Sequence, residues 1–222
     1  MRRLRRMTPR FGLFCVCLCA LACTACGTTG GNQQPATENR TVASFDQVDS
    51  NDGVETTLTI DPTQSGDVTL EVTAESNLLQ YVRTEVSNDL LGVGISESIQ
   101  SHIPITVLGS VSDISEAQVH NGSRLVVNGV DRETLTIGAV DGANLTATGS
   151  VDSLTAGGSG GATLTGSDLT ATTAQVGFSD GASATLCVSG EVTGSVTDGA
   201  SLTVLCGGDT SGVSTSNGGT VN

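Results

Sequence analysis

The sequence predicts an all-β fold, a right-handed parallel β-helix with about 19 residues per coil, preceded by a less regular β-rich part. A turn dipeptide, Asn-Gly, Asp-Gly or Gly-Gly, recurs six times in the C-terminal half, with successive starts 20, 19, 20, 18 and 19 residues apart. Self-similarity at a fixed period is typical of stacked repeats. The turns begin at Asn121, Asp141, Gly160, Asp180, Asp198 and Asn217.

The segments between these turns carry short apolar pairs that alternate with Thr, Ser and Gly. Such alternation indicates short strands with one buried face. An antiparallel sandwich would also supply short strands and frequent turns. It does not explain why the same turn dipeptide recurs about every 19 residues. In a β-helix the same turn stacks on itself, coil after coil. The pairs are Leu135/Ile137, Leu145/Ala147, Leu154/Ala156, Leu169/Ala171, Val176/Phe178 and Leu202/Val204.

Residues 1–25 read as an export signal rather than as part of the fold. "MRRLRRMTPR" carries five arginines, and the apolar run "FGLFCVCLCALA" that follows is too short to span a bilayer. Cys26 follows small residues, as the lipidated cysteine of a bacterial lipoprotein does, and Cys23 is the alternative. An ordinary secretory signal with incidental cysteines is the other interpretation. We expect an exported protein anchored by lipid in the cell membrane or outer membrane.

The segment 26–39 is polar and rich in Gly, Thr and Gln, which predicts a flexible linker before a folded domain over residues 40–222. The whole chain has a net charge of −14, and five of its nine basic residues lie in the export signal. The rest of the chain has four arginines and 23 acidic residues, so it is strongly acidic. A nucleic-acid partner is therefore excluded, because phosphate binding needs a basic surface.

Residues 40–120 are β-rich but lack the strict period. Val68, Leu70 and Val72 alternate with polar residues, as in a half-buried strand. Asn88-Asp89 is a hairpin turn candidate between "RTEVS" and "LLGVGI".

The stretches "RTVASFDQV", "VTLEVTAESNLLQYVRTEVSNDLLGVGI", "IPITV" and "ISEAQVHNGS", leading into Gly-rich turns, resemble the GIN domain. This family is known as the head of bacterial autotransporter adhesins, and the resemblance spans residues 40–222. It implies a right-handed parallel β-helix at the cell surface or in the envelope, often behind a lipoprotein signal. It transfers no binding or catalytic residue to this chain.

No cofactor or metal site is predicted, although calcium on the acidic turns stays open. Polysaccharide cleavage by a lyase needs a basic residue, and the segment 133–222 contains no Lys, Arg or His. A glycosidase needs two nearby carboxylates, which Asp141, Asp180 and Asp198 could supply as a stacked column. Asp before Gly is, however, a common turn former. The main prediction is a non-catalytic envelope lipoprotein, an adhesin that presents a polar surface to a glycan or cell-surface partner. The alternative is a carbohydrate-active hydrolase using the stacked Asp residues.

Cys187 and Cys206 lie one repeat apart, in an export context that permits a disulfide. Strand alternation, however, predicts that Cys187 points outward and Cys206 inward, so the sequence leaves the bond open. The C-terminal residues offer no polar cap or helix over the last coil. Because an open β-helix end exposes unpaired backbone, we also expect a homo-oligomer.

Overall fold

The computed structural model describes residues 27–222, and these fold into strands with a single short 3-10 turn, η1 (Leu79–Tyr81). The strands are β1 (Thr29–Gly30), β2 (Pro35–Val42), β3 (Gln47–Ser50), β4 (Glu55–Ile60), β5 (Val68–Glu75), β6 (Val82–Ser87), β7 (Leu90–Ile95), β8 (Ile99–Gln100), β9 (Thr106–Val111), β10 (Glu116–Val119), β11 (Arg124–Ala139), β12 (Asn144–Gly158), β13 (Thr163–Phe178), β14 (Ser183–Val188), β15 (Glu191–Val196), β16 (Ser201–Leu205), β17 (Asp209–Thr215) and β18 (Thr220–Val221). The predicted all-β class is confirmed.

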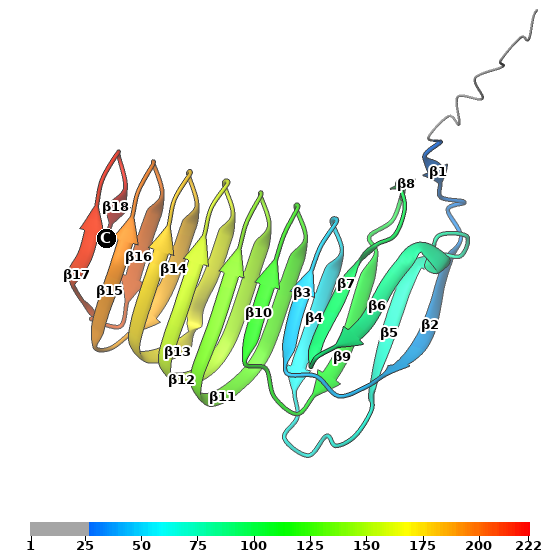
Figure 1. Ribbon diagram of the computed structural model, residues 1–222, viewed down its shortest axis with the longest axis horizontal. Helices are drawn as coiled ribbons and strands as arrows, with labels where there is room; N and C mark the ends of the chain where they lie inside the picture. The colour runs from blue at the N-terminus through cyan, green and yellow to red at the C-terminus, as the bar shows by residue number, and fades with distance from the viewer. Residues whose placement is uncertain (1–26) are drawn as a thin grey trace, which may run out of the picture.

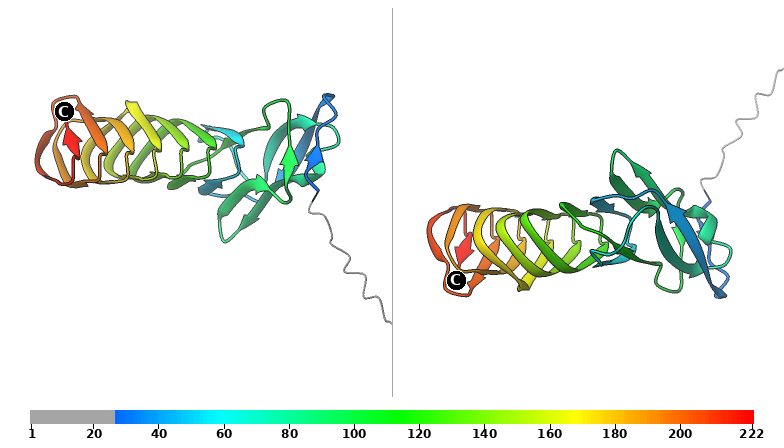
Figure 2. Two further views of the ribbon diagram at one scale, coloured as in Figure 1. Left: turned by 90° about the horizontal axis from the view of Figure 1, so that it is seen from above. Right: turned by 90° about the horizontal axis from the view of Figure 1, so that it is seen from below.

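The C-terminal half is a β-solenoid whose coils stack in parallel register (Figure 1). Leu125 of β11 lies beside Leu145 of β12, which lies beside Leu164 of β13. Each long strand bends at a corner where its register shifts, so one coil contributes more than one arm to the stack. Figure 2 shows these coils as a narrow column, and the N-terminal part as the broader end.

All six predicted turns lie at one edge of the coils, where they form a row of sharp tips (Figure 1). Both central residues of each turn have positive φ, as at Asp141 (54°) and Gly142 (70°), which is the geometry that Asn, Asp and Gly tolerate. Backbone bonds also join neighbouring tips: the Gly142 N–H donates to the carbonyl of Gly160 at 2.9 Å. The repeated turn dipeptide therefore reverses the chain and also joins adjacent coils through backbone hydrogen bonds.

The core is a set of apolar columns that run along the stack. The members of the predicted alternating pairs are buried, except that Val204 in the last coil is only partly buried. One column runs through Val107, Thr56, Leu125, Leu145, Leu164, Ala184 and Leu202. Each fully buried Leu in such a column contributes about 1.5–3 kcal/mol of burial free energy. The small Ala positions let the two sides of a narrow coil approach.

The N-terminal part continues the stack in a different chain order. β3 and β4 form a coil that lies between β10–β11 on one side and β7–β9 on the other. Both residues of its tip, Asp52 and Gly53, have positive φ, as in the six later tips. The predicted hairpin at Asn88-Asp89 is confirmed, because β6 pairs antiparallel with β7 across it. Val68, Leu70 and Val72 are buried, as expected.

An antiparallel layer covers the N-terminal end of the stack, and it corrects the predicted linker. β2 pairs with β5 over Pro35–Val42, so the ordered fold begins before residue 40. The polar composition of 26–39 hid this strand because its side chains lie on an exposed outer edge. Arg40 fixes the layer by donating from Nη2 to the Leu79 carbonyl at 2.8 Å.

Candidate binding surface

The carboxylates of the predicted Asp column lie on the exposed tips and hold the turns. Asp180 accepts a hydrogen bond from the Ser179 hydroxyl, and Asp198 accepts one from Thr197, each at 2.8 Å. Gly160 takes the tip position between Asp141 and Asp180, so the column is broken. The three carboxylates are exposed rather than gathered in a hollow.

Hydrogen bonds from the Asn217 amide and the Thr197 hydroxyl lower the pKa of the Asp198 carboxyl. A glycosidase acid needs the opposite, a raised pKa that keeps its proton. The tips thus support turn formation, and nothing in their geometry favours the hydrolase alternative.

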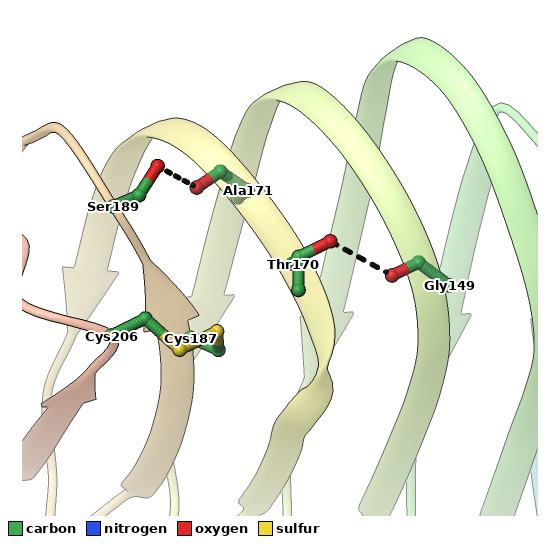
Figure 3. Close-up of a disulfide and its surroundings, with 6 residues drawn as sticks. All are labelled: Gly149, Thr170, Ala171, Cys187, Ser189 and Cys206. Atoms are coloured by element: carbon green, nitrogen blue, oxygen red, sulfur yellow. Dashed lines mark hydrogen bonds between the residues drawn. A yellow bond between two sulfur atoms is a disulfide. The ribbon is translucent and has the colours of Figure 1, made fainter.

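The structure joins Cys187 and Cys206 in a disulfide with a Cα–Cα distance of 5.2 Å (Figure 3). The predicted inward orientation of Cys206 was wrong, since Cys206 is exposed. Cys187 alternates with the buried Leu186 and Val188 and pairs with the exposed Thr170, which agrees with its predicted outward orientation. Cys206 has a φ of 69°, which breaks the strand alternation after β16 and turns its side chain back over Cys187. The bond ties the last coil to the one before it and is a structural staple.

The predicted lipidation residues, Cys26 and Cys23, lie outside the described residues. Within 27–222, no helix is long and apolar enough to cross a membrane. In the same range, no three His, Cys, Asp or Glu side chains gather as metal ligands would.

Two surface hollows lie on the outer sheet face formed by β6, β7, β3, β10 and the last arms of β11, β12, β13 and β15, and they adjoin where Asp49 pairs with Gln118. We call the two hollows together the face groove. Strand register defines its floor, one residue per strand: Glu85, Gly92, Asp49, Gln118, Gly138, Gly157, Gly177 and Ser195. Inward neighbours such as Ala117 and Val119 are buried, so Gln118 and its row face outward.

The C-terminal stretch of the face groove is a hollow of about 600 Å³. Gly157 and Gly177 form a floor without side chains, and the Gln118 side chain lies over Gly138 at its N-terminal end. One wall is the row Thr136, Thr155 and Gln175, and the other includes Ser159 and Ser179. The hollow is therefore shallow and neutral, with hydroxyl and amide groups at its rims.

The N-terminal stretch is a second hollow, of about 420 Å³, where the β6–β7 hairpin meets β3. It is charged: Asp49, Asp52, Arg83 and Glu85 line it around Gly92 and Gly94. Burial raises the pKa of the Asp49 carboxyl, although His120 and the Asn51 amide oppose the change. His120 Nε2 lies 3.4 Å from Asp49 Oδ1. A partly buried carboxyl with a shifted pKa in a surface hollow is typical of a binding site.

Sequence reasoning missed the face groove because its floor is defined by strand register. One signal was present, since Gly138, Gly157 and Gly177 recur with the same period as the tips. The N-terminal hollow has no periodic signal, because Asp49 and Glu85 come together only when β3 and β6 both flank β7.

Residues 44–208 match the family model described as "Putative auto-transporter adhesin, head GIN domain". Among solved structures, a protein from Bacteroides fragilis described as a "putative adhesin" aligns with a TM-score of 0.66 and 12% identity, over 86% of this chain and 97% of that one. A protein from Parabacteroides merdae with the same description aligns with a TM-score of 0.55 and 15% identity, over 87% of this chain and 98% of that one.

A protein from Parabacteroides distasonis described as lipid binding aligns with a TM-score of 0.55 and 13% identity, over 88% of this chain and 99% of that one. At these identities the likeness establishes the fold alone. No curated protein sequence matches this chain.

Proposed function

Because this chain belongs to the GIN-domain family of auto-transporter adhesin heads, we propose that it is a non-catalytic binding protein of the cell envelope. The observation that carries the proposal is the face groove, an open surface that crosses several strands and has hydroxyl, amide and charged side chains along its rims. An open groove suits an extended partner, whereas catalysis on a small substrate favours an enclosing cleft. The solved structures that share this fold and are described as putative adhesins support the same class of function.

The protein is held at the membrane by a lipid on Cys26, with Cys23 as the alternative residue. β1 begins at Thr29, so only a few residues separate the lipidated position from the folded part. The broad N-terminal end then faces the membrane and the solenoid projects away from it. Metabolic labelling with a palmitate analogue tests the anchor: Cys26→Ala abolishes labelling, and Cys23→Ala leaves it intact. Labelling that survives in both variants contradicts it.

Binding is tested with the chain beginning at Gly27, which contains the described core in full. We expect the fluorescently labelled protein to bind whole cells or isolated envelopes saturably. The Asp141→Asn/Asp180→Asn/Asp198→Asn variant is the matched control, since it removes tip charge and leaves the face groove unchanged. It should bind as the parent does and release no reducing sugar from polysaccharides. Absence of saturable binding to any envelope preparation would sink the proposal.

A further inference from the structure

We propose that the face groove binds a linear, neutral polysaccharide laid across the strands, with its chain parallel to the stack. This inference rests on the proposed binding function and names its ligand class. The two hollows share one floor row, which passes from Glu85 and Gly92 through Asp49 and Gln118 to Gly177. Together they offer a site several strands long, with strands about 4.8 Å apart.

The shape of the site depends on floor positions that the fold itself does not require to be glycine. A Cβ built at Gly177 meets no atom within 4 Å, and one at Gly157 meets only the Gly177 carbonyl, at an ordinary 3.5 Å. Neither residue has positive φ. A strand-interior glycine without such a need is typical of a place that a ligand approaches closely. The flat floor it leaves suits the face of a sugar ring.

The walls decide the chemistry of the ligand. Thr136, Thr155 and Gln175 on one side, with Ser159 and Ser179 on the other, present hydroxyl and amide groups that both donate and accept hydrogen bonds. These groups match the hydroxyls of a sugar. The C-terminal hollow has no charged residue in its lining, and the acidic surface of the protein repels polyanions.

An extended peptide fits this site less well. The floor strands already pair with neighbours on both sides through the parallel ladder. Their backbone groups are therefore used, and a peptide cannot add to the sheet across its face as it could at an edge. A hydroxyl-rich chain instead bonds to the rim side chains, which the ladder leaves free.

The charged N-terminal hollow gives the groove a direction. Arg83 and Glu85 lie on β6, across β7 from Asp49, so this end offers both a guanidinium donor and carboxylate acceptors. Such groups bind sugar hydroxyls more strongly than neutral groups do. We assign to this end the tighter subsite, and to the neutral hollow the continuation of the chain.

The experiment measures binding of neutral hexasaccharides, cellohexaose, xylohexaose and mannohexaose, by calorimetry with the chain from Gly27. Hexagalacturonate is the acidic comparison, and an extended hexapeptide of Ser and Thr is the peptide comparison. We expect at least one neutral hexasaccharide to bind and the other two classes not to bind. The Gly157→Val/Gly177→Val variant fills the floor and should weaken binding roughly tenfold to a hundredfold. Valine favours strands, so the variant keeps its fold.

Thr185→Val on β14 is the matched control, because it adds the same side chain to an outward strand position away from the face groove. It should leave the affinity unchanged. Failure of every neutral hexasaccharide to bind, or equal affinity in the floor variant, overturns the groove proposal. Cell binding separates the two proposals. If the floor variant still binds cells, the groove is rejected and the binding function stands. If a hexasaccharide binds but no cell or envelope does, the groove stands and the adhesin function fails.

Discussion

The carboxylate of Glu75 is fully buried in the N-terminal layer. It accepts hydrogen bonds from the Gln33 N–H at 2.7 Å, from the His102 N–H at 3.1 Å and from the Ser101 hydroxyl at 3.0 Å. Burial disfavours its charge, but these hydrogen bonds outweigh burial and lower the pKa of Glu75. The carboxylate therefore pins residues 31–33 against the loop after β8.

The lowered pKa makes stability depend on pH. Glu75 stabilises the fold fully above the pKa of the unfolded chain, about 4.3, and this contribution disappears as the pH falls through the lower folded pKa. We expect Glu75→Gln to melt well below the parent at pH 7 and to approach it near pH 3. Differential scanning fluorimetry across that range measures the gap. Glu71→Gln, on the exposed face of β5, is the control, and a gap that stays constant with pH refutes the assignment.

The Cys187–Cys206 bond closes a loop of 19 residues at the last complete coil. A bond over such a loop contributes about 2–4 kcal/mol. For a chain of this size, Cys206→Ser should lower the melting temperature by roughly 4–16 °C. A reductant should lower the parent to the same temperature and leave the variant unmoved. A parent whose melting is insensitive to reductant would show that the bond does not form in solution.

At the scale of the coil, corner glycines and face glycines have opposite roles. Gly149 stands at a corner with a φ of 129°, and a Cβ there would lie 2.0 Å from the Val130 carbonyl oxygen. Gly177 stands in an open face position with ordinary φ. The corner needs glycine for its conformation, and the face does not.

Alanine substitution separates these roles. Gly149→Ala should lower the free energy of unfolding by about 1–3 kcal/mol, because alanine strains the backbone at this φ. Gly177→Ala should raise the free energy of unfolding by about 0.5–1 kcal/mol, because glycine in a strand is destabilising relative to alanine. Urea midpoints at equal m-values provide the measurement. A loss of stability in Gly177→Ala would mean that the fold requires this glycine, and it would remove the argument that the face groove is kept for a ligand.

The tips were predictable and the corners were not, for a physical reason. Asn-Gly and Asp-Gly encode positive φ locally, so the turns at Asn121 and Asp198 are legible from the sequence alone. A corner forms where a strand shifts register against its neighbour, as after Val127. That shift depends on the adjacent coil with which the strand pairs, so no local sequence pattern encodes it. The same dependence hid the orientation of Cys206, because its left-handed φ follows from the corner after β16.

At the scale of the molecule, the period predicted the solenoid but not its chain order. The coil formed by residues 47–60 lies between the coil of β7 and β9 and the coil of β10 and β11, and Gln47 pairs with Glu116 across 69 residues of sequence. No local pattern encodes that contact. The described chain first joins the covering layer with β2, enters the stack at β3 and β4, and returns to the layer through β5 and β6. It then re-enters the stack with β7 and β9, and only afterwards builds the regular coils. The charged end of the face groove results from this chain order, because β3, β6 and β7 supply its lining.

The two ends of the described stack differ, and the difference predicts how copies associate. Antiparallel strands cover the N-terminal end. At the other end, β17 pairs only with β15, and β18 only with β16, among the described residues. Leu205 is 40% exposed there. Strand edges of this kind pair with other chains unless charge or proline blocks them.

We expect two copies of the chain from Gly27 to join through these last coils, and light scattering should give the mass of a dimer at micromolar concentration. Ser214→Lys/Thr215→Lys places two charges on exposed positions of β17 and should yield the monomer without lowering the melting temperature of the coils. A parent that is monomeric over the whole concentration range contradicts the prediction. When each copy uses the same C-terminal edge, such pairing closes at two, and it leaves both N-terminal ends and both face grooves free.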